Sequence, residues 1–395
     1  MRGLSTGTAA RSDRTADPAL LTIAREWGRI GCIGFGGPPA HIALLRRLCV
    51  ERRRWLEPRD FEDAIAACNL LPGPASTQLA IYSAWRLRGR AGALLGGVCF
   101  IVPGLVLILA LAALFLAATP PDWVRGAGAG AGAAVPAVAV RAGSSLIPDS
   151  WRRARSGIRW LAFLAAGAVS AAVIGPWLVL VLLGCGLVEV AIRREARVTD
   201  GLSAAGPAPL LAAAAAATGG LLALVWVAFK VGALSYGGGF VIVPLMQADA
   251  VNHYHWMTAG QFLNAVALGQ VTPGPVVQTV AAVGYAAAGI GGGLLAAVIA
   301  FSPSFAFVLL GGRHFERIRT NDTAKAFLDG AGPAAIGAIL GTAVPLTRAL
   351  TETWQYAVLA AAALLLVVLR RSVVATLLLA GVTGAVVALA GGPLP

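Results

Sequence analysis

Long apolar runs recur along this chain and limit what it can fold into. A run of about 20 apolar residues can cross the roughly 30 Å hydrocarbon core of a bilayer as a helix. Of the 395 residues, 58% are hydrophobic and only 12% are charged, which is too few charges for a typical water-soluble domain. We therefore expect an all-α polytopic membrane protein. The clearest apolar runs are 92–118, 160–192, 209–229, 292–312, 355–369 and 373–391.

The net charge of +13 is compatible with a nucleic acid or a membrane surface as the partner. The arginines, however, lie in short loops between apolar runs, as expected for the cytoplasmic loops of a membrane protein. A nucleic-acid-binding protein needs a soluble basic domain, and no polar segment here is long enough to form one. We therefore expect the lipid bilayer, and not a nucleic acid, as the partner.

A Pro-Gly-Pro triplet, here called the PGP triplet, occurs twice within apolar sequence. Pro72, Gly73 and Pro74 recur 201 positions later as Pro273, Gly274 and Pro275. With this offset and no gap, residues 29–100 align with residues 230–301, and 16 of the 72 aligned positions are identical. Ungapped agreement over this length indicates an internal duplication.

The two halves carry their basic residues in different loops. Residues 46–59 contain six arginines, whereas the matching residues 247–260 contain no Lys or Arg. Because basic loops stay in the cytoplasm, matching loops should lie on opposite sides of the membrane. We therefore predict two homologous halves arranged as inverted-topology repeats, an arrangement found in secondary transporters. The predicted organisation is a cytoplasmic N-terminal tail (1–22), a first repeat (23–192), a cytoplasmic linker (193–208) and an inverted second repeat (209–395).

The positive-inside rule, by which basic loops stay in the cytoplasm, also orients the chain in the cytoplasmic membrane. The N-terminus is predicted to be cytoplasmic and the C-terminus external. The predicted cytoplasmic loops are 46–59, 86–90, 148–159, 193–207, 313–326 and the pair Arg370 and Arg371. The predicted external loops are 119–125, 247–260 and 346–353.

The segment 60–85 is flanked by arginines at both ends and has its PGP triplet near the middle. A segment that starts and ends on one side of the membrane must turn back, which predicts a broken or re-entrant helix. Such backbone is tolerated at membrane depth where protein or a water-filled cavity surrounds it. An ordinary kinked span is the alternative that the sequence leaves open.

Each PGP triplet is placed to start a new half-helix, at Ala75 and at Val276, because proline is favoured in the first helical turn. The free N–H groups of a helix N-terminus can bind an anion. Glycine turns at 34–39 and 236–239 would allow close backbone approach, although Gly and Pro can also serve helix packing. The symmetric placement favours a substrate site. The predicted substrate-binding residues are Arg29, Phe35, Gly36, Gly37, Pro38, His41, Pro72, Gly73, Pro74, Ser76, Thr77, Gln78, Lys230, Tyr236, Gly237, Gly238, Gly239, Thr272, Pro273, Gly274, Pro275, Gln278 and Thr279.

Two cations occupy matching positions in the halves. Arg29 and Lys230 each precede a glycine pair by seven residues. A cation within the membrane suggests a functional site, so this pair predicts an anionic substrate; snorkelling to the interface is the structural alternative. Arg141 is a further candidate cation inside a span. Asp63 is the candidate for coupling transport to protons.

Enzyme chemistry finds little support in the sequence. A membrane enzyme needs converging carboxylates, a histidine pair or a nucleophile with its base, whereas the PGP segments contain Gly, Pro, Ser, Thr and Gln. A Walker-type phosphate-binding motif is missing from the sequence. His253 and His255 are not accompanied by a cluster of Asp, Glu or Cys residues, so a metal site there is the weaker interpretation. We expect no enzyme activity, no cofactor and no metal.

Residues 28–104 resemble the chromate ion transporter family. The family's motifs are present as Phe35 to Pro38, Ala40 to Ile42, Glu51 to Leu56 and Leu70 to Leu79, and the second half carries matching versions at 236–239 and 272–275. Together these motifs cover both halves of the long, two-domain form. One departure is Gly239, which stands where the first half has Pro38 and puts strict equivalence of the two turns in doubt.

The resemblance implies export of chromate across the cytoplasmic membrane, driven by the proton motive force, and hence chromate resistance. It also implies a link to sulfate, a tetrahedral dianion of similar shape. A sulfate or other oxyanion carrier, working in uptake or export, and a non-transporting membrane protein are the alternatives. The sequence leaves the oligomeric state open, a homodimer included.

Overall fold

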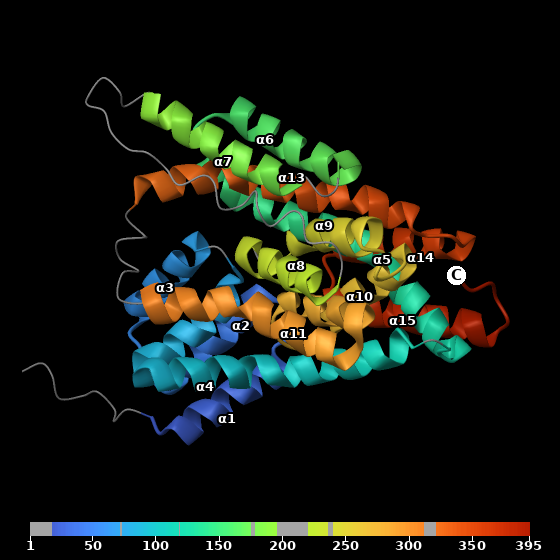
Figure 1. Ribbon diagram of the computed structural model, residues 1–395, viewed down its shortest axis with the longest axis horizontal. Coiled ribbons are helices and arrows are strands. Elements are labelled where there is room, and N and C mark those ends of the chain that lie inside the picture. The colour runs from blue at the N-terminus through green and yellow to red at the C-terminus, as the bar shows by residue number, and fades with distance from the viewer. Residues whose placement is uncertain are drawn as a thin grey trace, which may run out of the picture.

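The computed structural model describes residues 18–71, 73–117, 119–174, 178–195, 220–235, 240–311 and 321–395. Every regular element in these ranges is helical (Figure 1). Within the described ranges, four stretches are long and apolar enough to cross a membrane, namely Ala75–Phe115, Asp122–Arg153, Val276–Gly311 and Asp322–Arg348. The predicted all-α membrane architecture is therefore confirmed. Pro72, Tyr236, Gly237, Gly238, Gly239 and most of the predicted tail and linker lie outside the described residues.

The two halves contain the same succession of helices. The first half comprises α1 (Leu20–Ile33), α2 (Pro38–Arg46), α3 (Pro58–Leu70), α4 (Ala75–Phe115), α5 (Asp122–Arg153), α6 (Gly157–Val169) and α7 (Leu178–Glu195). The second half comprises α8 (Gly220–Leu234), α9 (Ile242–Gln247), α10 (Ala259–Val271), α11 (Thr279–Gly311), α13 (Asp322–Arg348), α14 (Thr353–Ala363) and α15 (Val373–Leu389).

The first PGP triplet is the tip of a helical hairpin. Near the start of α3, Asp60 forms an ion pair with Arg86 of α4, with 2.9 Å between Oδ2 and Nη2, so the chain returns to where the hairpin began. α4 then breaks at Gly89, whose φ of +58° lies in the left-handed region that favours glycine. Beyond the break, Gly97 lies against Ile81. α4 therefore consists of two helices that run back along each other.

The second half repeats this hairpin. α10 leads into the second PGP triplet, a 3-10 turn follows at Val276–Gln278, and α11 continues from Thr279. Gly269 on one arm lies against Thr279 on the other. α11 then breaks at Gly289, where φ is +63°. The α3 hairpin lies toward the left end of Figure 1, whereas the break in α11 lies toward the right.

The structure corrects the ungapped alignment of the halves. The offset of 201 holds through the PGP triplets, but later features match at an offset of 200. The helix breaks lie at Gly89 and Gly289, and the prolines inside the helices lie at Pro103 and Pro303.

The physical reason is that the second half-helix starts with a tighter 3-10 turn, whereas the first starts as an α-helix at Ala75. The tighter start fits a one-residue deletion. Gln78 is therefore the counterpart of Gln278, whereas the ungapped alignment pairs Gln78 with Thr279.

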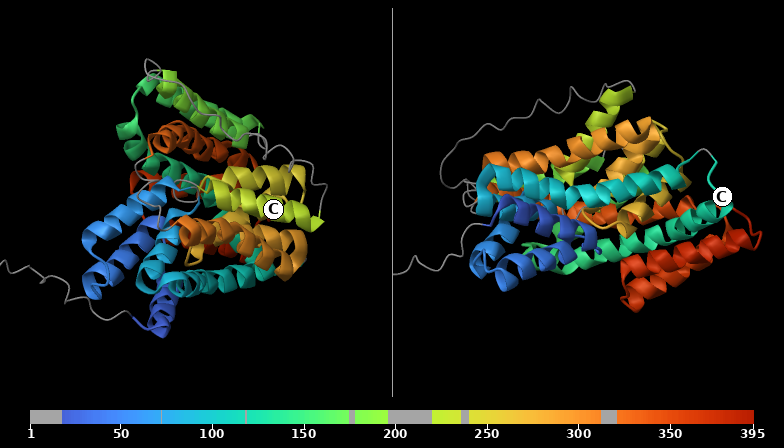
Figure 2. Two further views of the ribbon diagram at one scale, coloured as in Figure 1. Left: turned by 60° about the vertical axis from the view of Figure 1, so that its left-hand side comes forward. Right: turned by 90° about the horizontal axis from the view of Figure 1, so that it is seen from below.

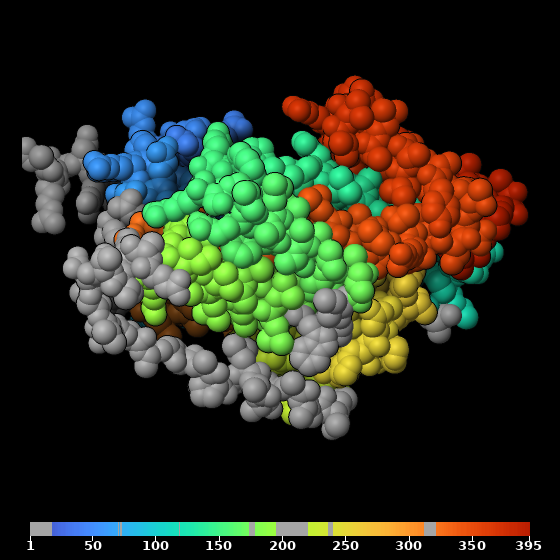
Figure 3. Space-filling model, turned by 90° about the horizontal axis from the view of Figure 1, so that it is seen from above, coloured from blue at the N-terminus to red at the C-terminus, as the bar shows by residue number. Residues whose placement is uncertain are grey.

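The halves interlock through their later helices. α5 packs along α14 and α15 of the second half, whereas α13 packs along α6 and α7 of the first. Glycines permit this approach, because Gly384 abuts the carbonyl of Gly126 and Gly167 abuts that of Ala334. Figure 2 shows the α14–α15 hairpin (red) at the end of the molecule away from the blue α1–α3 segment, and Figure 3 shows it beside the green α5–α6 region.

Candidate functional site: a basic cavity between the halves

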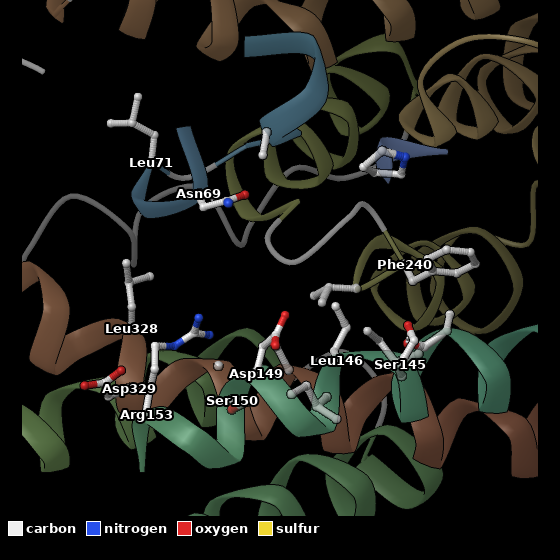
Figure 4. A pocket seen from close by; sticks show the side chains of 18 of the residues that line it. Asn69, Leu71, Ser145, Leu146, Asp149, Ser150, Arg153, Phe240, Leu328 and Asp329 are labelled. Carbon is white, nitrogen blue, oxygen red and sulfur yellow. Dashed lines mark hydrogen bonds between the residues drawn. The ribbon is translucent and has the colours of Figure 1, made fainter. Parts of the chain in front are cut away.

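A cavity of about 1510 Å³ lies between the two halves. One wall is formed by α2, α3 and the first PGP turn, and the facing walls come from α5, α7 and α13. Figure 4 shows Asn69 and Leu71 across the cavity from Ser145 and Asp149 of α5. The cavity is large enough for a small oxyanion with its water of hydration.

The glycine turn and the PGP turn of the first half line this cavity. Gly36 and Gly37 have φ values of +97° and +75°, so glycine is favoured at both positions. α2 begins directly after them at Pro38, and α4 begins after Gly73 and Pro74. Neither helix start is capped by a side chain. α2 begins with two prolines, which have no N–H, so its first turn offers an anion little, whereas the first turn of α4 offers the N–H groups of Ala75 and Ser76.

One face of α5 forms much of the opposite wall. Val138, Arg141, Ser145, Asp149 and Arg153 recur every three or four residues, as one face of a helix requires, and all five line the cavity. Arg153 lies at the end of α5, next to the loop. Arg141 lies twelve residues earlier, which places it roughly 18 Å deeper along the helix axis.

The remaining cations that line the cavity lie near its outer end. Arg155 and Arg159 are in or next to the α5–α6 loop, Arg193 and Arg194 end α7, and Lys325 is in the first turn of α13.

Some of these cations form ion pairs with carboxylates. Arg193 contacts Glu189 at 2.9 Å and Asp329 at 2.7 Å, and Arg159 contacts Glu189 at 3.3 Å. This network joins α6, α7 and α13 beside the cavity. The outer end is therefore basic but partly neutralised.

His41 lies behind the cavity wall, fully buried. Its Nε2 is 2.8 Å from the carbonyl oxygen of Gly34, which can only accept, so Nε2 carries the proton. In the neutral ring Nδ1 then accepts from the hydroxyl of Ser76, 3.3 Å away. His41 therefore holds the glycine turn against the start of α4, and neither His41 nor Ser76 lines the cavity.

The second PGP turn is enclosed in protein. Thr272, Pro273, Gly274, Pro275, Gln278 and Thr279 are all buried, and none lines the cavity. Gln278 donates through Nε2 to the carbonyl oxygen of Ile101 at 2.7 Å, and Thr279 donates to that of Val276 at 2.8 Å. The two halves therefore differ in this conformation, because only the first PGP turn reaches the cavity.

The two matched cations do not meet at the PGP turns. Arg29 is exposed in a shallow surface pocket with Arg25, Glu26 and Arg53. Lys230 forms a buried ion pair with Asp249, with 2.6 Å between Nζ and Oδ2. Neither lines the large cavity. Their part in substrate binding stays a prediction that the cavity geometry does not support.

Other predicted residues also lie outside the cavity lining. Thr77 and Gln78 are buried in the interior, Phe35 is exposed, and Asp63 is half-buried on α3.

Among the lining residues that the sequence prediction missed are Asn69 and Gln270. Each stands three residues before its PGP triplet, and this matched spacing was the signal that could have revealed them.

Long apolar helices around a basic internal cavity define a class, the multi-pass membrane transporters. Within that class, this chain belongs to the chromate transporter family. The family's sequence model matches the chain twice, at residues 21–190 and 222–385, which agrees with two homologous halves. It is a family of transporters and not of enzymes.

Two relatives support the assignment. A chromate transport protein of Cupriavidus metallidurans is 32% identical, and the match covers 98% of this chain and 97% of the relative. A chromate transport protein of Pseudomonas aeruginosa is 32% identical, with 82% of this chain and 80% of the relative covered. No solved structure matches the chain.

Proposed function

We propose that this protein is a secondary transporter that exports chromate across the cytoplasmic membrane, driven by the proton motive force, and so confers chromate resistance. One observation carries the proposal. In a member of the chromate transporter family, a cavity leads from arginine-rich loops to the glycine turn and the uncapped start of α4 in the first half. Helix starts and arginines are groups that bind oxyanions.

We propose that the two halves are inverted repeats whose PGP hairpins are re-entrant. Support comes from the opposite ends at which the first hairpin and the α11 break lie in Figure 1, and from the arginines of 46–59 that the matching loop lacks. On this proposal the N-terminus is cytoplasmic and the C-terminus external.

The described conformation would load its substrate from the cytoplasm. The cations at the outer end of the cavity, among them Arg153, Arg155 and Arg194, belong to loops that the positive-inside rule assigns to the cytoplasm. A basic entrance raises the local concentration of anions and speeds their capture.

The difference between the halves suggests how the cavity alternates. α10 packs extensively on α5, whereas its counterpart α3 barely touches α13 and leaves the cavity between them. Rocking α3 onto α13 while α10 leaves α5 would close the present cavity and open its counterpart on the other side. Inverted repeats provide this exchange because each half can adopt the other's arrangement. Asp63 is proposed as the proton-coupling residue.

The test is uptake of radiolabelled chromate into everted membrane vesicles, with and without a proton gradient. We expect uptake that exceeds that of vesicles lacking the protein and that collapses when a protonophore is added. Vesicles that contain the protein but accumulate no more chromate than empty controls would reject export.

Sulfate is the second candidate substrate, because arginine, amide and backbone N–H donors recognise the oxygens of any tetrahedral dianion. Excess sulfate added to the same vesicles distinguishes the two. Near-complete inhibition of chromate uptake by this excess would favour a general oxyanion carrier, whereas weak inhibition would favour a carrier selective for chromate.

A further inference from the structure

We propose that the inner end of the cavity is an oxyanion subsite built from Arg141 and the amide side chains of Asn69 and Gln270. The proposal rests on the proposed transport of a tetrahedral dianion and names the side chains that hold it. It differs from the sequence prediction, which assigned the charge to Arg29 and Lys230.

The two amides are counterparts in the duplicated halves. Asn69 ends the first arm of one hairpin, Gln270 ends the first arm of the other, and each stands three residues before its PGP triplet. Both line the same cavity. A pair of matched amides that converge on one space is what a substrate site between duplicated halves requires.

Gln270 has a buried hydrogen-bond donor without an acceptor, which indicates a ligand beside it. Its side chain is only 8% exposed, and its Nε2 has no hydrogen-bond partner among the described residues. Buried polar groups are almost always hydrogen-bonded, because a buried donor without an acceptor raises the free energy of the folded state. Nε2 itself is covered in this conformation, so a rotation of the side chain toward the cavity would let an oxygen of a bound oxyanion supply the missing acceptor.

Arg141 supplies the charge. It lies deep on α5, whereas the other cations in the lining belong to the outer end. Its guanidinium makes no hydrogen bond or ion pair with any described residue, although the residue is partly buried. A guanidinium presents five N–H donors in a rigid fork that matches oxyanion geometry, which a partnerless arginine is free to use.

The surroundings favour an anion over a cation at this depth. Among the described residues, the carboxylates in the lining are Asp149, Asp322 and Asp329, and Asp149 is two helical turns from Arg141 toward the outer end. Asp322 and Asp329 lie in the first turns of α13. Ala75, in the uncapped first turn of α4, lines the cavity and adds backbone N–H donors.

The two halves contribute matched amide side chains to the subsite, but only the first half contributes an arginine. Pro136 and Pro148 of α5 have the same spacing as Pro333 and Pro345 of α13, which aligns the two helices. This alignment puts Ala338 at the position that matches Arg141. One cation with several neutral donors would therefore serve the substrate in both orientations of the cavity.

The experiment compares Asn69→Asp, Gln270→Glu and Arg141→Gln with the wild-type protein. Asn69 is exposed, and aspartate has the same shape, so the first variant changes charge with little effect on folding. Arg348→Gln is the matched control, because Arg348 is an exposed arginine of α13 outside the cavity lining. Two quantities are measured: the KM for chromate in everted vesicles, and the shift in the unfolding temperature of the purified protein on adding sulfate, which is redox-inert.

We expect Asn69→Asp and Arg141→Gln to raise the KM by about tenfold or more and to abolish the sulfate-induced shift, because charge-assisted hydrogen bonds are the stronger ones. Gln270→Glu should act in the same direction, and Arg348→Gln should match the wild type. Folded Asn69→Asp protein that keeps both the KM and the shift would overturn the subsite. If the wild type moves no chromate, the proposed function fails, and the sulfate shift alone then decides the subsite.

Discussion

The backbone N–H of Gly274 donates a hydrogen bond to the carbonyl oxygen of Gly34, with 3.0 Å between nitrogen and oxygen. This bond joins the PGP turn of the second half to the glycine turn of the first. The same oxygen also accepts from His41 at 2.8 Å. One peptide oxygen therefore connects both halves beside the glycine turn, whose Gly36 and Gly37 line the cavity.

His41→Ala should destabilise the protein without weakening substrate binding directly. The change removes two buried hydrogen bonds and the edge-on contact with Phe100, whose ring centroid is 5.1 Å away, at a cost of about 2–4 kcal/mol. Chemical unfolding of the purified protein in detergent measures this cost. Unchanged stability combined with a higher KM for chromate would instead favour the substrate-binding role predicted from the sequence.

Lys230 and Asp249 should behave as a structural ion pair. Their side chains are 10% and 6% exposed, so removing one partner leaves a buried, unpaired charge. We expect Lys230→Met alone to cost roughly 3–5 kcal/mol and to reduce the amount of protein in the membrane. The double variant Lys230→Met/Asp249→Leu should recover most of that amount. A stable Lys230→Met protein that fails to transport would restore Lys230 as the substrate's cation.

The contact between α6 and α13 should depend on the glycines that lie in it, and Gly167 is the one on α6. A Cβ at Gly167 would overlap the backbone of Ala334, whereas a Cβ at Gly184 of α7 meets nothing within 4 Å. We therefore expect Gly167→Ala to destabilise the protein by about 1–3 kcal/mol, and Gly184→Ala to be neutral or slightly stabilising. Thermal unfolding of both variants, measured side by side, gives the comparison. Equal stability would mean that the interlocking of the halves is looser than described.

The sequence predicted the parts of the fold that local chemistry determines. The helix starts at Ala75 and Val276 were predicted from the prolines beside them, and the structure places helical turns at both positions. Pro74 and Pro275 themselves are the N-cap residues, one position before the first helical turn in which they were expected. The duplication predicted that the second half repeats the helix order of the first. The deletion after the second PGP triplet escaped prediction, because a 3-10 and an α-helical start differ by one residue and leave little trace in an ungapped alignment.

The site was harder to predict, because matched sequence positions need not have matched surroundings. Arg29 and Lys230 are counterparts, yet one is exposed and the other is paired with Asp249, nineteen residues further along the chain. Conversely, Arg141 has no cationic counterpart in the second half, so the comparison of the two halves did not select it as a substrate-binding residue. Which hairpin reaches the cavity depends on the packing of α10 on α5, a contact between distant segments that residue spacing does not reveal.

The proposed orientation predicts which side can reach Ser145, an exposed residue of the cavity wall. In a background without the five native cysteines, Ser145→Cys should react with a membrane-impermeant thiol reagent in everted vesicles and much less in right-side-out vesicles. Sulfate in excess should slow the reaction by occupying the cavity. Faster labelling in right-side-out vesicles would place the cavity entrance on the external side.

The most direct measurement of the central claim uses the purified protein alone in liposomes. Liposomes loaded with unlabelled chromate and diluted into a trace of radiolabelled chromate should accumulate the label transiently, because a carrier exchanges internal for external substrate. The account predicts this counterflow for the wild type and its loss in Arg141→Gln. Label that enters no faster than in protein-free liposomes, with the protein folded and inserted, would contradict it.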